Sequence, residues 1–299
     1  MRVLLTGGTG YVGGRLREFL VEDGHEVRLF VRPSSKDKVK ALEKKGTFDI
    51  VYGDVYQTNA VLHACDGVDA VVHLVGIIRE FPNKGITFEE LHRVATSNVV
   101  DAAKRTRVQR FVHMSALGAA NDAESAYHRT KRAAERIVED SGLKWTIFRP
   151  SWIFSPGDEL TRTIVSLVQR KFLPLISGGR SQMQPVALDD VCSCMSKSLA
   201  MPETQGKIYE LGGPDRLAFK EIVATAASQL GRKPKEVVVP AWAVRPFVWA
   251  LQRFESFPLT LDQLKMLSKD NVCEIDPFVK TFQIEPKSFR SAIPALFGG

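Results

Sequence analysis

The sequence lacks any long apolar run, which argues against a membrane-spanning protein. No stretch of the 299 residues approaches the roughly 18 consecutive apolar residues that a spanning helix requires. The first strand-like run, RVLLTGG, begins at residue 2, so we expect no signal peptide. These absences predict a cytoplasmic protein, with peripheral contact to the inner face of a membrane as the alternative.

Cysteine is also scarce, with four residues in the chain: Cys65, Cys192, Cys194 and Cys273. The pair at 192 and 194 has no second pair nearby, so it is not a zinc pattern, and nothing suggests a disulfide framework. We expect reduced thiols and no metal site. The net charge is +7, but the sequence contains no basic run, which argues against nucleic acid as a partner.

What the first half does contain is a regular alternation of apolar strand-like runs and helical patterns. We expect strands over 2–7, 26–32, 48–52, 69–75, 109–115 and 144–149. Helical patterns lie between them at 11–23, 57–64, 88–106 and 125–141. Several strand runs are almost continuously apolar, as in parallel strands covered on both faces. The alternation predicts an α/β fold with a doubly wound parallel sheet of the Rossmann type.

After Pro150 the alternation gives way to loop-like stretches such as SPGDEL. Helices are expected at 159–171, 189–200, 218–230 and 259–268, with one strand at 207–211. We therefore expect an NAD(P)-binding domain over 1–155 and a smaller, irregular substrate or partner lobe over 156–299, with room for their segments to interleave. Open α/β sheets bind ligands at the carboxyl ends of their strands, so such a lobe would close over that edge.

A glycine-rich loop, LLTGGTGYVGGRL, joins the first expected strand to the first expected helix. Its glycines permit a tight turn and let the backbone approach a pyrophosphate, which the free N–H groups of the helix N-terminus attract. The position between a strand and a helix supports a dinucleotide site. The residues expected to contact the cofactor here are Gly7, Gly10, Tyr11, Val12 and Gly13.

The choice of cofactor depends on the end of the second strand, FVRPSSK, where no acid lies between Glu26 and Asp37. NAD-selective sites usually carry an acid there, whereas a cation suits the 2′-phosphate of NADP. Arg32 occupies this position, and a guanidinium binds phosphate through two hydrogen bonds. NADP(H) is therefore favoured, and NAD(H) stays usable if Arg32 only stacks on the adenine.

The helix expected at 125–141 carries Tyr127 and Lys131 four positions apart, which makes them neighbours on its surface. A phenol is a poor acid or base at neutral pH, and an adjacent ammonium favours its ionised form. Such a pair suits proton transfer beside a nicotinamide. We expect this pair at the edge of a small-residue stripe that packs closely: Ala126, Thr130, Ala133, Ala134 and Ile137.

Together, TGGTGYVG, GDV, HLVG, YHRTK and the strand-end Ser115 resemble the extended and atypical short-chain dehydrogenase/reductases, the NAD-dependent epimerase/dehydratase family. The resemblance runs through FRPSWIFSPGD, and QPVALDDV and YELGGPD look like that family's substrate lobe. At finer grain, VHLVGII, SALGA, WTIFRPSWIF and LTLDQLKMLSKDNV resemble bacterial proteins similar to the NAD(P)H-binding accessory subunit of respiratory complex I.

The resemblance implies an NAD(P)-dependent oxidoreductase and a role for individual residues. Ser115 would polarise a substrate carbonyl, Tyr127 would donate or accept a proton, and Lys131 would hold the ribose while lowering the pKa of the tyrosine. Asn98 matches a supporting asparagine of the family. Further positions would contact the cofactor or lie by the nicotinamide: Asp54, Val55, Leu74, Val75, Gly76, Pro150 and Ser151.

Two alternatives to this function stay open. Nucleotide-sugar epimerases and dehydratases share the same front half. The resemblance to the complex I subunit implies instead a non-catalytic scaffold or assembly protein that holds NADPH as a structural element. Among other reactive residues, His73 and His113 lie inside apolar strands and are expected in the core. Asp189 and Asp190 are expected to cap the helix that follows rather than to form a carboxylate pair.

The segment VVVPAWAVRPFVWALQRF, residues 237–254, is dense in aromatic residues, and its only charges are Arg245 and Arg253. Two interpretations stay open: a core for the smaller lobe, or an exposed apolar surface. An exposed surface would favour an apolar, quinone- or isoprenoid-like substrate, or contact with a membrane or a respiratory complex. Pro246 and the short length exclude a spanning helix.

Overall fold

The computed structural model describes residues 1–255, 257 and 259–297. They divide into two compact units whose segments alternate along the chain. The first unit comprises Met1–Pro150, Leu188–Glu210 and Pro277–Ile284. The second comprises Ser151–Ala187, Leu211–Asp276 and Glu285–Gly299.

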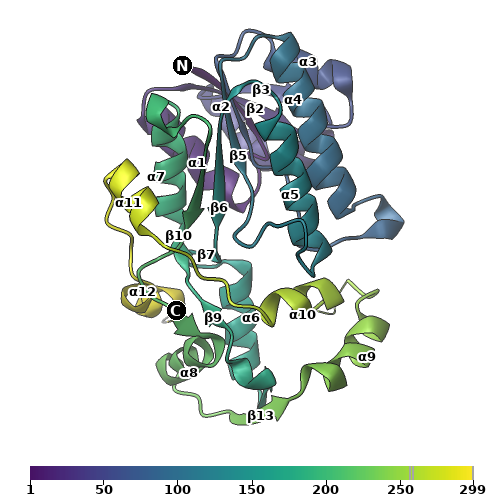
Figure 1. The fold of residues 1–299 in the computed structure, drawn as a ribbon, viewed down its shortest axis with the longest axis vertical. Coiled ribbons are helices and arrows are strands. Elements are labelled where there is room, and N and C mark those ends of the chain that lie inside the picture. The colour runs from purple at the N-terminus through teal and green to yellow at the C-terminus, as the bar shows by residue number, and fades with distance from the viewer. Residues whose placement is uncertain (256, 258, 298–299) are drawn as a thin grey trace. The chain divides into compact units, whose positions relative to one another are not determined.

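The described residues of the first unit form a seven-stranded sheet in the order β11-β6-β5-β4-β1-β2-β3 (Figure 1). Its strands are β1 (Arg2–Thr6), β2 (Glu26–Val31), β3 (Asp49–Tyr52), β4 (Ala70–His73), β5 (Arg110–Met114), β6 (Lys144–Pro150) and β11 (Lys207–Leu211). The pairing is parallel from β6 across to β3, with Val3 opposite Val27 on one side and Ala70 on the other. The expected doubly wound α/β fold is confirmed.

Helices cover both faces of this sheet (Figure 1). On one face, α1 (Tyr11–Glu22) packs on α7 (Leu188–Ser198). On the other, α4 (Ala95–Arg105) lies between α3 (Thr58–Cys65) and α5 (Ala126–Glu139). Every residue of β4 is buried, because helices cover it on both sides.

Other elements of the first unit are shorter or more exposed. They are η1 (Pro33–Ser35), α2 (Lys36–Lys45), η2 (Pro82–Lys84), η3 (Glu89–Val94), η5 (Pro202–Thr204) and α11 (Asp276–Phe282). The helix expected over 88–106 begins with the π-helical turn η3 and continues as α4. Such turns often occur at functional sites, and this one turns His92 inward, where it is buried.

The second unit has a core of its own. Its elements are β7 (Ile153–Phe154), α6 (Glu159–Val168), β8 (Phe172–Ile176), η4 (Ser177–Gly179), β9 (Gln182–Met183), β10 (Val186–Ala187), β12 (Leu217–Ala218), α8 (Phe219–Gln229), β13 (Lys235–Val239), α9 (Ala241–Leu251), α10 (Leu261–Leu267) and α12 (Phe289–Phe297). Helices α6, α8 and α12 pack together around Ile164, Ile222 and Phe289. No helix in the described part of the chain is long and apolar enough to cross a membrane.

The aromatic segment 237–254 is largely exposed. It spans the end of β13 and all of α9, where Val248 is the only buried residue among those described. Trp242 is 76% exposed, Phe247 68% and Trp249 70%. The interpretation of this segment as a core is therefore wrong for these three side chains. They form an exposed apolar surface instead.

Candidate nucleotide and catalytic site

The glycine-rich loop leaves the sheet where its strand order reverses. Strand β1 lies between β2 and β4, so the loops that follow β1 and β4 meet at the carboxyl edge. The N–H of Leu74 donates to the carbonyl of Thr6 at 3.2 Å and joins the two loops. Such a reversal is where doubly wound sheets bind nucleotides.

Glycine is required at two positions of the loop. Gly7 has a φ of +77°, and a Cβ there would lie 3.1 Å from the carbonyl carbon of Leu74. A Cβ on Gly13 would lie 2.3 Å from the carbonyl oxygen of Gly7. Gly10 caps α1 and donates its N–H to the same oxygen at 3.0 Å. Helix α1 therefore begins directly against the loop, with its first N–H groups at the carboxyl edge.

The first helical residues and the loop after β4 complete this cradle. Tyr11 is exposed at the start of α1, whereas the neighbouring Val12 is buried. Leu74 is buried, and Val75 packs against the core beneath. A Cβ on Gly76 would lie 2.9 Å from Nζ of Lys131, so the backbone of this loop lies directly against the ammonium.

Strand β5 and helix α5 bring the expected catalytic residues to the same edge. Ser115 directly follows β5, and its hydroxyl is buried with no hydrogen-bond partner in the described part of the chain. Lys131 Nζ donates to the carbonyl of Met114, the neighbour of Ser115, at 3.1 Å. Tyr127 lies one turn earlier on α5, and both side chains are buried. Ser125 caps the start of α5, and its hydroxyl accepts from the N–H of His128.

Burial controls the protonation of both residues. It lowers the pKa of Lys131 to about 8, against an opposing effect of the Glu135 carboxylate. It raises the pKa of Tyr127 to about 12. The resemblance implied a lowered pKa for the tyrosine, and the structure shows the opposite direction, because desolvation penalises the phenolate. Tyr127 is therefore a phenol at neutral pH, which suits a proton donor.

Aromatic rings hold Tyr127 in place. Phe88, His92 and His128 pack edge-on against it, with ring centroids 5.7, 5.4 and 5.1 Å away. His92 Nδ1 lies 2.8 Å from Oγ1 of Thr130, and its Nε2 lies 3.0 Å from the carbonyl of Ile77. His92 thus links α5 to the loop after β4. No local sequence pattern identifies this histidine, because no periodicity marks a histidine in a π-helical turn.

Residues expected at the adenine end lie on the loops after β2 and β3. Arg32 is exposed directly after β2, and no described residue forms a hydrogen bond or ion pair with its side chain. The Asp54 carboxylate accepts from the N–H of Tyr56 at 3.2 Å. Asn98 Nδ2 donates to the carbonyl of Val55 at 2.9 Å, so this asparagine supports the Asp54–Val55 turn.

These residues fit a nicotinamide dinucleotide. The cradle of Gly7, Gly13 and Gly76 is kept open by the lack of Cβ atoms that would collide with backbone or with Lys131. The unpartnered hydroxyl of Ser115 and the buried ammonium beside it are polar groups in need of a ligand. The exposed Arg32 is free to bind a phosphate.

Pro150 and Ser151 fall in different units. Pro150 is the last residue of β6, and its carbonyl accepts from the N–H of Leu117, in the loop after β5, at 3.0 Å. Ser151 begins the second unit, where its hydroxyl donates to Oδ1 of Asn271 at 2.5 Å.

The histidines expected in the core lie there. His73 and His113 are buried and stack at 5.6 Å, and burial lowers the pKa of His73 to about 3. Asp189 and Asp190 lie within the first turn of α7, where the helix dipole stabilises carboxylates. Asp189 also accepts from Nε of Arg15 at 2.8 Å.

The stripe expected on α5 is partly wrong. Of its five residues only Ala134 is buried, while Ala126, Thr130, Ala133 and Ile137 are half-buried. The buried face is instead formed by Tyr127, Lys131, Ala134, Glu135 and Val138. Two charged residues can occupy this face because each has a partner from elsewhere in the first unit.

Comparison with known proteins agrees with this geometry. Residues 7–199 match a family described as NAD(P)H-binding. The chain is 26% identical over 285 residues to the mitochondrial 40 kDa subunit of NADH-ubiquinone oxidoreductase of Neurospora crassa, covering 94% of this chain and 74% of that protein. It is 30% identical over 244 residues to a ceramide reductase of Caulobacter vibrioides, covering 80% of this chain and 73% of the reductase.

A solved structure shows the same fold. An NADPH-dependent quinone oxidoreductase of Escherichia coli, in complex with NADPH, matches with a TM-score of 0.80 at 16% identity, covering 99% of each chain. The present chain belongs to the NAD(P)H-binding family, whose oxidoreductase and epimerase-type relatives the resemblance implied. Its cofactor is NAD(P)H.

Proposed function

We propose that the protein is an NADP(H)-dependent oxidoreductase that reduces a carbonyl group of an apolar, lipid-like substrate. The observation that carries this proposal is the burial of Ser115, Tyr127 and Lys131 at the end of β5, with the serine hydroxyl left without a partner. Buried, unsatisfied polar groups cost stability, so their presence at a nucleotide-binding edge supports a functional role.

Each residue has a separate task in this reaction. Ser115 donates a hydrogen bond to the substrate carbonyl oxygen and polarises it. When bound, the reduced nicotinamide supplies a hydride to the carbonyl carbon. Tyr127 donates its phenolic proton to the oxygen, which completes the alcohol. Lys131 holds the cofactor ribose against the loop after β4. The raised pKa of Tyr127 keeps this proton in place until the oxygen becomes basic.

The preference for NADP(H) is assigned to Arg32. Its side chain lies at the end of β2, where a bound dinucleotide places its adenosine ribose. A guanidinium without another partner binds the 2′-phosphate through two charge-assisted hydrogen bonds.

An apolar substrate is supported by two observations. One relative with 30% identity is a ceramide reductase, and ceramide is a lipid. The exposed aromatic face of α9 carries Trp242 and Trp249, and the segment 237–254 contains two arginines and no acid. Tryptophan and arginine together suit the interface of an anionic membrane. We assign this face to peripheral contact with the inner surface of a membrane, where a lipid substrate would be met.

A second candidate is supported by the match to the complex I subunit, which extends over 94% of this chain. In that case the protein holds its nucleotide as a structural element in contact with a respiratory complex and turns nothing over. Both candidate functions use the same cofactor site. They differ in whether NADPH is oxidised, so a measurement of NADPH consumption distinguishes them.

The experiment that tests the proposal combines native mass spectrometry with a ligand screen. Mass spectrometry of the purified protein should show NADP(H) bound. A thermal-shift screen of the NADPH-loaded protein should show stabilisation by keto-lipids or quinones and none by UDP-sugars. Stabilisation by a UDP-sugar alone would favour a nucleotide-sugar epimerase.

A further inference from the structure

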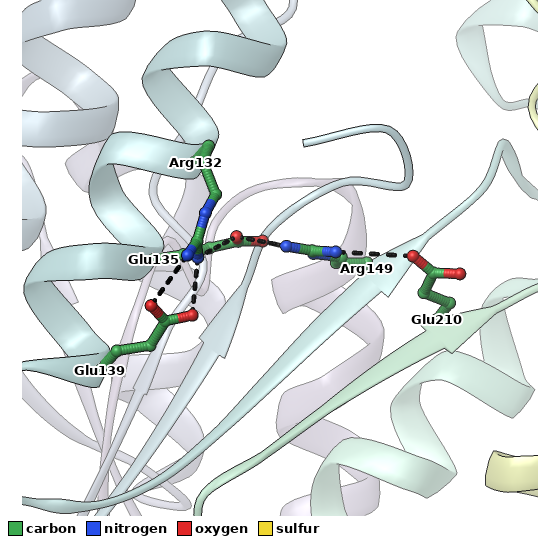
Figure 2. Close-up of polar contacts among 5 residues, drawn as sticks. All are labelled: Arg132, Glu135, Glu139, Arg149 and Glu210. Carbon is green, nitrogen blue, oxygen red and sulfur yellow. Dashed lines mark hydrogen bonds and ion pairs between the residues drawn. The ribbon is translucent and has the colours of Figure 1, made fainter. Parts of the chain in front are cut away.

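A buried carboxylate lies one turn after Lys131 and takes no part in the proposed reaction. The Glu135 side chain is 0% exposed and binds two guanidinium groups (Figure 2). Arg149 Nε donates to Oε1 and Arg149 Nη2 to Oε2, each at 2.7 Å. Arg132 Nη1 donates to Oε2 at 3.0 Å. Both carboxylate oxygens are therefore satisfied, and the pair with Arg149 is bidentate.

The outer members of the network are more exposed. Glu139 accepts two hydrogen bonds from Arg132, at 2.6 and 3.0 Å, and lies on the same helix (Figure 2). Glu210 lies 3.5 Å from Nη1 of Arg149. Among these residues Glu139 contacts only Arg132, which lies on the same helix. Glu139 therefore adds a negative charge to α5 but does not join the helix to β6.

The pair of Glu135 with Arg149 joins α5 to β6, the strand that is hydrogen-bonded to the backbone of Ser115. Arg149 follows Phe148 on β6, and the carbonyl of Phe148 accepts from the N–H of Ser115 at 2.7 Å. Lys131, on α5, donates to the carbonyl of the residue before Ser115. Hydrogen bonds thus link α5 to β5, the residue after β5 to β6, and β6 back to α5, next to the proposed catalytic residues.

Glu135 is also a carboxylate four residues after Lys131 on the same helix. Residues four apart on a helix have Cβ atoms roughly 5–6 Å apart. The other titratable groups that face the ammonium are neutral at pH 7: His73 on β4, His92 on η3, His113 on β5 and Tyr127 on α5. Burial lowers the pKa of each histidine and raises that of the phenol. Within the described residues, Glu135 is therefore the one charged group that favours the charged form of Lys131, beside the hydrogen bond to the carbonyl of Met114.

We propose that Glu135 is a positioning residue: its pair with Arg149 holds α5 against β6, and its carboxylate supplies the counter-charge that keeps Lys131 protonated for nucleotide binding. The inference rests on the nucleotide role assigned to Lys131 above. It adds a residue that touches neither cofactor nor substrate and acts through the ammonium.

The first test measures Lys131 in the protein without added nucleotide. NMR titration of ¹³C-labelled lysine, with Lys131→Met to assign the signal, gives its pKa in the wild type, in Glu135→Gln and in the control Glu139→Gln. The pKa should fall by about one unit in Glu135→Gln and stay within about 0.3 units in Glu139→Gln. A role in packing alone would let water reach the ammonium and raise its pKa, so an unchanged or raised value in Glu135→Gln overturns the proposal.

The second test measures NADPH affinity by calorimetry at pH 6 and pH 8. At pH 6 Lys131 is protonated in every variant, and the amide oxygen of glutamine still accepts from Arg149 and keeps α5 in place, so Glu135→Gln should bind nearly like the wild type. At pH 8 a pKa lowered by one unit leaves about a fifth of the wild-type charged fraction, which predicts affinity reduced about fivefold. Equal weakening at both pH values would indicate disrupted packing and contradict the electrostatic role.

A third variant covers the case in which Glu135→Gln does not fold. Arg149→Gln keeps the carboxylate and removes a competing cation, so the pKa of Lys131 should rise while NADPH affinity at pH 6 stays near that of the wild type. An unchanged or lowered pKa, or a raised pKa together with weakened binding at pH 6, overturns the proposal. The titration involves no turnover. A protein that shows the predicted shifts but consumes no NADPH would therefore refute the proposed function and leave the role of Glu135 standing.

Discussion

Replacing Lys131 by methionine should stabilise the protein relative to the wild type at pH 7 more than at pH 10. The lysine is 3% exposed, and burial lowers its pKa from 10.5 to about 8. Between these values the unfolded chain binds more protons than the native state, so the stability of the wild type rises with pH. Methionine has a similar shape and no such dependence.

The magnitude follows from the two pKa values. At pH 7 the buried charge costs the wild type about 3 kcal/mol, and at pH 10 most of that cost is gone. The stability of the wild type relative to Lys131→Met should therefore rise by about 2.5 kcal/mol between pH 7 and pH 10. Costs that do not depend on pH, such as the lost hydrogen bond to Met114, cancel in this comparison.

Urea unfolding of both proteins at pH 7 and pH 10 measures this change. The exposed Lys104, replaced by methionine in the same way, is the matched control, and its difference from the wild type should stay nearly constant with pH. A difference between the wild type and Lys131→Met that does not change with pH would refute the buried-ammonium reasoning on which the site rests.

Three further predictions concern the cofactor loop and the exposed helix. Arg32→Ala should weaken NADPH binding about tenfold or more and NADH binding little, by calorimetry, and equal affinity of the wild type for both cofactors would contradict the assignment. Gly13→Ala should cost about 1–3 kcal/mol in unfolding free energy and weaken nucleotide binding. Gly14→Ala should be tolerated, because its added Cβ meets nothing within 4 Å. Equal effects of the two substitutions would contradict the requirement for glycine at position 13. Replacing Trp242 and Trp249 by serine should abolish co-sedimentation with anionic vesicles, and unchanged binding would exclude α9 as the contact.

The sheet was predictable because its strands are continuous apolar runs. The expected strands over 26–32 and 109–115 differ from β2 and β5 by at most one residue at each end, since burial on both faces leaves a strong local signal. Helix α2 was missed because KDKVKALEKK has little apolar content, with Val39 buried and most of its neighbours exposed. A polar, exposed helix carries no periodic stripe to detect.

The electrostatics of the site could not be predicted from local sequence. A stripe of small residues was the expected packing face of α5, yet Lys131 and Glu135 are buried there. What permits this is Arg149, which lies 14 residues after Glu135 on a neighbouring strand. Likewise, the sequence alone could not show that Trp242 and its aromatic neighbours are exposed, because a core and a surface helix share the same composition.

The measurement that tests the central claim most directly is single-turnover oxidation of NADPH. Wild type and Tyr127→Phe, each loaded with NADPH, are mixed with a keto-lipid in micelles, and the loss of NADPH fluorescence is followed. The wild type should consume one equivalent. Tyr127→Phe should bind NADPH with the same affinity and consume none, because the ring still packs against Phe88 and His92 but has no proton to donate. Equal consumption by both proteins would contradict the catalytic role of Tyr127, and consumption by neither, across keto-lipids and quinones, would contradict the proposed reductase.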